Sequence, residues 1–172
     1  DDDTYIKIIS PNFSLLQYKS NSEELQLKRL IRISDPEEDK KTIFIWPEGI
    51  FYESYLTDIA KYKDLFKSEF SKNHLVILGI NNFQKGNTLK DTKYFNSLVV
   101  LNNNLEVKNL YNKVNLVPFG EFMPFENFFS KIGLKKITRG YNSFSPGENR
   151  ELINLPNNFN NKLLLPLICY EI

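Results

Sequence analysis

The sequence is poor in cysteine and histidine, with one of each, Cys169 and His74, among its 172 residues. A single cysteine excludes an intrachain disulfide and any metal site built from several cysteines. Histidine is the usual base for a catalytic cysteine. His74 opens an apolar run, however, and is better explained as an ordinary strand residue. The chain therefore offers one thiol and needs another kind of base to activate it.

The sequence also lacks a long hydrophobic run and a charge excess. Apolar runs such as 75–80 and 163–168 are far shorter than the roughly 20 residues that a membrane-spanning helix needs. With 22 basic and 21 acidic residues the net charge is +1, which argues against nucleic acid as a partner. The first residues, 1–3, are acidic, whereas a signal peptide begins with positive charge.

What is present is the pattern of one folded α/β domain. Hydrophobic residues make up 41% and aromatic residues 14%, which is typical of a globular chain. The periodicity predicts helices over 20–34 and 53–73, and strands over 5–10, 42–46, 74–80, 94–101, 105–111 and 163–168. Apolar strands separated by helices favour a sheet that is covered on both faces.

Polar residues follow three of these predicted strands. Glu48 follows strand 42–46, Lys113 follows strand 105–111, and Cys169 follows strand 163–168. In layered α/β folds, functional sites assemble at the carboxyl ends of strands. A carboxylate can take the proton of a thiol, and an ammonium can stabilise the oxyanion of a tetrahedral intermediate. The three residues together therefore point to acyl transfer, although each alone has an ordinary structural explanation.

The same residues lie in motifs that resemble those of the nitrilase superfamily. Residues 45–48 (Ile-Trp-Pro-Glu) resemble its Glu motif, 111–113 (Tyr-Asn-Lys) its Lys motif, and 169–171 (Cys-Tyr-Glu) its Cys motif, in the family's order. This resemblance implies a nitrilase-like αββα sandwich, here truncated after the nucleophile strand. Residues 1–172 would form one such domain, incomplete at its C-terminal end.

A longer segment points to one family within this superfamily. Residues 113–124 (Lys-Val-Asn-Leu-Val-Pro-Phe-Gly-Glu-Phe-Met-Pro) closely resemble the corresponding part of the apolipoprotein N-acyltransferase family, with Asn115 where members often carry His. The resemblance implies a bacterial inner-membrane enzyme whose nitrilase-like domain faces the periplasm and whose membrane domain lies outside this chain. Such an enzyme needs no cofactor and moves an acyl chain from a phospholipid to the N-terminal amine of a diacylated lipoprotein cysteine.

The resemblance also implies roles for individual residues. Glu48 would be the general base, Cys169 the nucleophile that forms a thioester, and Lys113 the group that stabilises the oxyanion. The supporting residues would be Glu121, Tyr170 and Glu171. From the residues alone, Glu121 has a simpler alternative, which is to hold Lys113 by an ion pair.

Two other functions stay open from the sequence. A soluble nitrilase-type amidase would use the same three residues with water as the acceptor and a small amide as the substrate. An inactive fragment would keep the residues but not the chemistry. Because the chain ends three residues after Cys169, we expect the isolated chain to have little or no acyltransferase activity, since catalytic groups must be held in place by surrounding packing.

The loop 118–129 is rich in aromatic residues, which permits two interpretations. Its side chains, among them Phe119, Phe122 and Phe125, would either be buried in the core or form a lid that meets acyl chains at the membrane surface. The two interpretations differ in what removal of the aromatic rings does to turnover.

If the loop is a lid, replacing Phe125 and Phe128 together with Ser in the complete enzyme should lower turnover of a membrane-embedded phospholipid. The physical reason is loss of apolar contact with the acyl chains. The measurement is acyl transfer from phospholipid vesicles, with a short-chain water-soluble ester as the control donor. Unchanged turnover of the vesicle donor would refute the lid.

Overall fold

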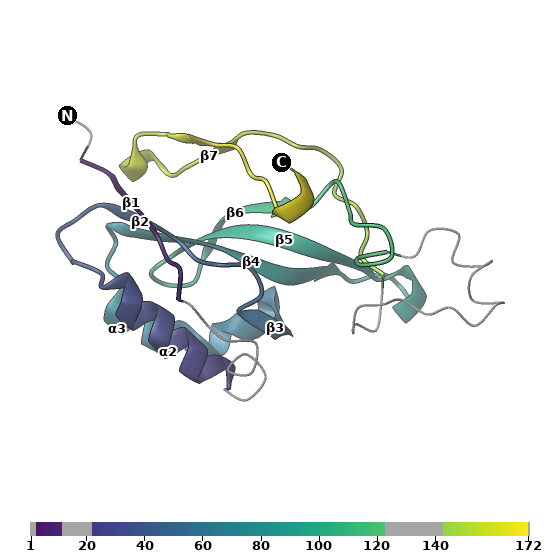
Figure 1. Cartoon of the computed structure of the whole chain (residues 1–172), viewed down its shortest axis with the longest axis horizontal. Helices are drawn as coiled ribbons and strands as arrows, with labels where there is room; N and C mark the ends of the chain where they lie inside the picture. Colours follow the sequence, from purple (N-terminus) through teal and green to yellow (C-terminus); the bar gives the residue numbers. More distant parts are fainter. Residues whose placement is uncertain (1–2, 12–21, 123–142, 172) are drawn as a thin grey trace.

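A computed structural model describes residues 3–11, 22–122 and 143–171 of the chain. Its centre is a six-stranded sheet with the order β1-β2-β4-β5-β6, in which β3 pairs beside β4. These strands are β1 (Tyr5–Ile8), β2 (Thr42–Ile45), β3 (Phe51–Tyr55), β4 (His74–Gln84), β5 (Lys93–Asn102) and β6 (Val107–Asn112). The sheet lies between a helical layer and an extended C-terminal segment (Figure 1).

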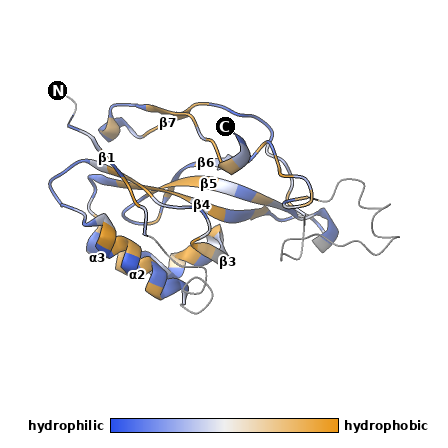
Figure 2. Ribbon diagram, viewed as in Figure 1, coloured by the Kyte–Doolittle hydropathy of each residue, from blue (hydrophilic) through white to orange (hydrophobic). Residues whose placement is uncertain are grey.

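The strand directions decide where the sheet delivers its polar residues. β1, β2 and β4 run parallel, whereas β4, β5 and β6 form an antiparallel meander. β6 therefore runs in the same direction as β2, so Glu48 and Lys113 leave the sheet at the same edge. Figure 2 shows β4 and β5 changing from mainly hydrophobic to mainly hydrophilic toward that edge.

Two helices, α2 (Glu23–Ser34) and α3 (Lys63–Glu69), cover one face of the sheet. Ser22 caps the N-terminus of α2, and its side chain accepts a hydrogen bond from a backbone N–H of the first turn. Its apolar side chains Leu27 and Leu30 are fully buried against the sheet. The Trp46 indole donates to Ser34 Oγ at 2.9 Å, which ties the last turn of α2 to the end of β2.

The C-terminal segment covers the other face. It contains two short antiparallel strands, β7 (Ile153–Asn154) and β8 (Leu163–Leu164). Leu155 and Phe159 pack on Ile77 and Val100 of the sheet. The layers follow the expected nitrilase-like order of helices, sheet and second sheet. No α-helix follows β6 within the described ranges.

The prediction of one helix over 53–73 is wrong. That segment contains the end of β3, a 3-10 helix (Leu56–Tyr62) and only then α3. The cause is pairing with β4, because Tyr55 lies in register with Asn81. The Tyr55 ring also packs on Phe83 and Tyr94, with centroids 5.3 and 5.9 Å apart. β4 accordingly extends to Gln84, beyond its predicted end at residue 80.

The predicted strand 163–168 is also too long. Only Leu163 and Leu164 pair with β7, and the residues from 165 to Cys169 form no strand. Pro166 explains the early end, since proline has no N–H to donate to a ladder. The other predicted strands are present, including the hairpin that turns at 102–104. None of the helices in the described ranges is long and apolar enough to cross a bilayer.

His74 has the structural role expected of it and links stability to pH. It is 1% exposed, its Nδ1 accepts from the Ser71 N–H at 2.9 Å, and its Nε2 lies 3.0 Å from the Glu37 carbonyl oxygen. Both ring nitrogens are thus used by a neutral imidazole. Burial lowers the pKa of His74 below its usual 6.5.

Because the folded pKa of His74 is lowered, the unfolded chain binds more protons just below pH 6.5. The contribution of His74 to the free energy of unfolding is therefore complete above pH 6.5 and is lost as the pH falls below it. Urea unfolding at a series of pH values should detect this decrease, and His74→Gln should reduce it. An unchanged pH profile in the variant would contradict the assignment.

Candidate active site

Glu48 lies just beyond β2, next to the middle of β4. The Trp46 N–H donates to the Ile77 carbonyl oxygen at 2.8 Å, which continues the pairing of β2 with β4. Gly79, two residues after Ile77 on β4, leaves room for the Glu48 side chain, because a Cβ on Gly79 would lie only 3.2 Å from Glu48 Cγ. Glu48 itself is exposed. The predicted base is therefore at the sheet edge and accessible.

Lys113 lies at the same edge of the sheet as Glu48, and it is buried, with 1% of its surface exposed. Its Nζ lies 2.9 and 3.1 Å from the two carboxylate oxygens of Glu121. Its backbone N–H donates to the Asn96 carbonyl oxygen at 2.8 Å and so extends the β5–β6 pairing by one residue. The ion pair that sequence reasoning offered as the simpler role of Glu121 is present.

Asn96 joins these two parts of the site, and sequence reasoning missed it. Its side-chain Nδ2 donates to Glu121 Oε1 at 2.8 Å and to Glu48 Oε1 at 3.0 Å. One amide thereby links the predicted base with the partner of Lys113. The signal in the sequence was a pair of polar residues, Asn96 and Ser97, inside an otherwise apolar strand.

The ionisation of Glu121 follows from its neighbours. Its burial opposes ionisation, but the hydrogen bonds from Asn96, from the Val117 N–H and from Lys113 outweigh the burial and lower its pKa. The Val117 N–H donates at 2.8 Å and closes the turn 117–121 on the carboxylate. Glu121 is thus an ionised group whose oxygens are occupied by donors.

Cys169 lies on a separate turn, a 3-10 helix over Cys169–Glu171 that sits above β5 and β6 (Figure 1). Its thiol is exposed and its φ is +48°. This left-handed conformation costs a non-glycine residue about 1–2 kcal/mol, so neighbouring contacts must hold it. Within the described residues, no hydrogen bond joins Cys169 to Glu48 or Lys113.

Glu171 supplies those contacts. It is 5% exposed, and its carboxylate accepts from the Tyr111 hydroxyl (2.8 Å) and from the backbone N–H groups of residues 114 (2.9 Å), 115 (3.0 Å) and 168 (3.0 Å). Burial opposes its ionisation, and these hydrogen bonds together lower its pKa. The Cys169 turn is therefore fastened to the turn that follows Lys113.

The remaining predicted residues lie around these turns. Tyr170 is 73% exposed and directly follows Cys169. Phe119 is 43% exposed with a φ of +62°, and Phe122 is half-buried. Phe125 and the rest of the predicted lid lie outside the described residues, so the lid stays a prediction.

No protein-family model matches the chain. Among curated proteins, it is 32% identical over 133 residues to "Apolipoprotein N-acyltransferase" of Rhizobium leguminosarum bv. trifolii, covering 77% of this chain and 24% of that protein. It is 28% identical over 181 residues to the protein of the same name from Rhodopseudomonas palustris, covering 99% of this chain and 33% of that protein. A solved structure of N-terminal amidase with an Asn-Glu-Ala peptide aligns with a TM-score of 0.38 at 16% identity, over 65% of this chain and 28% of that chain.

The chain is a layered α/β domain that brings Glu48 and Lys113 to one edge of its sheet. By sequence, the chain is similar to proteins named apolipoprotein N-acyltransferase. It spans about a quarter to a third of the length of the curated relatives it matches.

Replacing Asn96 with Asp tests the shared amide. The variant keeps the shape but loses both donated N–H groups and adds a third carboxylate, so we expect a loss of about 1–3 kcal/mol in the free energy of unfolding at pH 7. The loss should shrink near pH 5, where a protonated Asp can donate again. Urea unfolding at the two pH values measures both effects.

The matched control is Asn103→Asp, which makes the same chemical change in the turn between β5 and β6. Its stability should stay within about 0.5 kcal/mol of the wild type. Equal losses in the two variants would show that the carboxylate is harmful anywhere in this hairpin and would contradict a specific role for Asn96.

Proposed function

We propose that the protein containing this chain is an apolipoprotein N-acyltransferase, which moves an acyl chain from a phospholipid to the N-terminal cysteine amine of a lipoprotein. The observation that carries the proposal is the network of Glu48, Asn96, Glu121 and Lys113 at one sheet edge. It occurs in a chain whose sequence relatives carry this name. Both reactants would be lipids, with phospholipid as the donor and a diacylated lipoprotein as the acceptor.

In the first half-reaction, Cys169 Sγ attacks the carbonyl carbon of a phospholipid ester while Glu48 takes the thiol proton. The carbonyl oxygen becomes an oxyanion that the Lys113 ammonium stabilises. The tetrahedral intermediate then breaks its bond to the glycerol oxygen. Glu48 returns the proton to that oxygen, which leaves a lysophospholipid and a Cys169 thioester.

In the second half-reaction, the lipoprotein amine attacks the thioester carbonyl and passes a proton to Glu48. The same oxyanion position beside Lys113 is used again. Collapse of this intermediate forms the amide and expels the Cys169 thiolate, which regains its proton from Glu48. The two half-reactions use the same base, the same nucleophile and the same cation, as is usual when catalysis passes through a covalent intermediate.

The contacts of the three carboxylates favour Glu48 as the base. Glu121 is committed to Lys113 and to the Val117 N–H, and Glu171 is committed to five donors around the Cys169 turn. Glu48 is exposed and accepts from Asn96. A base must be free to accept a proton during the reaction, and Glu48 is the carboxylate of the three that meets this need.

We also propose the setting of the reaction. The protein would lie in the bacterial inner membrane, with residues 1–172 forming part of a nitrilase-like domain on the periplasmic side. The membrane helices would belong to the portion of the protein outside this chain. The supporting fact is the length of the relatives, of which the chain spans about a quarter to a third.

The decisive experiment uses the complete protein in vesicles of phospholipid that carries a labelled acyl chain. Mass spectrometry should find the acyl group on Cys169 before acceptor is added, and Cys169→Ala should abolish it. Lys113→Met should lower the acylation rate about 10²–10³-fold, and Glu48→Gln about 10²–10⁴-fold.

Glu106→Gln, an exposed change on the β5–β6 hairpin, serves as the control and should acylate at the wild-type rate. Hydrolysis of a small amide by the wild type, without any acyl group on Cys169 from phospholipid, would refute the acyltransferase and favour an amidase.

A further inference from the structure

Residues 143–150, which we call the strap, cross the edge of the candidate site without forming a helix or a strand. Backbone N–H groups of the strap donate to the carbonyl oxygens of Glu121 (2.8 Å), Tyr94 (2.7 Å) and Lys113 (2.8 Å). These acceptors belong to the turn 117–121, the start of β5 and the end of β6. The strap therefore joins three separate segments that bound the site.

Gly147 is the point of closest approach between the strap and Lys113. A Cβ at this position would lie 2.1 Å from the Asn112 carbonyl oxygen and 2.9 Å from its carbonyl carbon. Both are backbone atoms, so no flexible side chain can move aside. The φ of Gly147 lies outside the left-handed region. The requirement for glycine is thus one of space, set by the residue next to Lys113.

Arg150 is the second point of attachment. Its Nη2 lies 3.3 Å from Glu171 Oε1, and within the described residues it is the one cation paired with that buried carboxylate. Glu171 in turn holds the Cys169 turn against residues 114 and 115. Arg150 consequently acts on Cys169 through Glu171, and among the described residues no hydrogen bond or ion pair joins it to the thiol or to Lys113.

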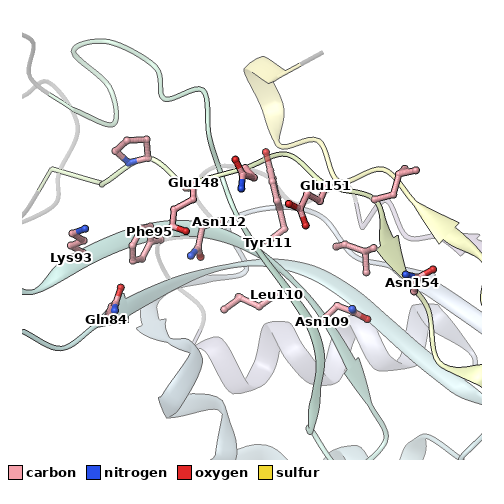
Figure 3. A pocket seen from close by; sticks show the side chains of 15 residues that line it. Gln84, Lys93, Phe95, Asn109, Leu110, Tyr111, Asn112, Glu148, Glu151 and Asn154 are labelled. Carbon is pink, nitrogen blue, oxygen red and sulfur yellow. The ribbon is translucent and has the colours of Figure 1, made fainter.

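A pocket lies beside the strap. Its volume is about 580 Å³, and its lining includes residues 146–149 of the strap and residues 109–112 of β6 (Figure 3). Glu148 is exposed along this stretch. The contacts that hold the strap include its three backbone hydrogen bonds and the pairing of Arg150 with Glu171, and those at Gly147 and Arg150 are the ones that reach Lys113 and the Cys169 turn.

We propose that the strap is a positioning element for the reaction and that Gly147 and Arg150 are its positioning residues. Gly147 fixes the strap to Lys113, and Arg150, three residues later, fixes it to the turn that presents Cys169. The strap thereby sets the spacing between the oxyanion-stabilising group and the nucleophile. This inference rests on the proposed roles of Lys113 and Cys169. Its test distinguishes a failure of the positioning role from a failure of those proposed roles.

The first measurement is acylation of Cys169 by labelled phospholipid in the complete protein. Arg150→Met and Gly147→Ala should each lower the maximal acylation rate, by up to about 10²-fold if the reacting groups shift by about 1 Å. The donor concentration at half-maximal rate should not change if the two residues act by placing Lys113 and Cys169 rather than by binding the donor. Arg150→Lys, which keeps a cation, should recover part of the rate. Glu148→Gln is the matched control on the strap and should behave as the wild type.

The second measurement needs no acyl donor. Amide hydrogen exchange should show reduced protection in Gly147→Ala and Arg150→Met at both turns, residues 113–116 and 168–171, while β2 and β4 keep theirs. Since Arg150 is exposed, its variants should fold even if Gly147→Ala does not.

Together, the two measurements show whether the proposed function or only the positioning role of the strap is wrong. Absence of a Cys169 thioester in the wild type would remove the proposed function, whereas wild-type exchange in both strap variants would remove the positioning role. Wild-type acylation rates in the Arg150 variants, or an equal loss in Glu148→Gln, would also overturn it.

Discussion

The rest of the candidate site depends on the burial of the Lys113 ammonium. Placing such a charge at 1% exposure costs several kcal/mol unless a countercharge lies beside it. Glu121 provides that countercharge through both oxygens, and it is itself stabilised by Asn96 and the Val117 N–H. The turn 117–121 and the polar part of β5 are thus fixed by one electrostatic requirement. Glu48 joins the same network through the second contact of Asn96.

The three carboxylates of the site divide into two kinds. Glu121 and Glu171 each have a lowered pKa because several donors converge on them, and each fastens one turn to the sheet. Glu48 is exposed, with a glycine rather than a side chain beneath it. Identical functional groups therefore serve as fixed anchors or as an accessible acceptor according to the number of donors around them.

The sequence predicted every strand of the main sheet except β3, as well as the polar residues that follow β2 and β6, because both follow from local signals. Apolar runs mark β2 and β4, and the motif residues Glu48 and Lys113 come directly after strands. It failed where tertiary contacts override the local pattern, as in the segment 53–73, whose first part pairs with β4. It also failed to find Asn96, Gly147 and Arg150. Their roles arise from neighbours that are distant in sequence, such as Glu48 for Asn96 and Glu171 for Arg150.

The strand connections also set the order in which the parts of this site can form. β4, β5 and β6 are consecutive hairpin partners, so the segment that places Asn96 beside Lys113 closes short loops. Glu48 must join Asn96 across 48 residues, and Glu171 must join Tyr111 across 60. Contacts between residues far apart in sequence form more slowly than local ones, because more chain entropy is lost first. During folding, Lys113, Glu121 and Asn96 are therefore expected to come together before Glu48 and the Cys169 turn reach them.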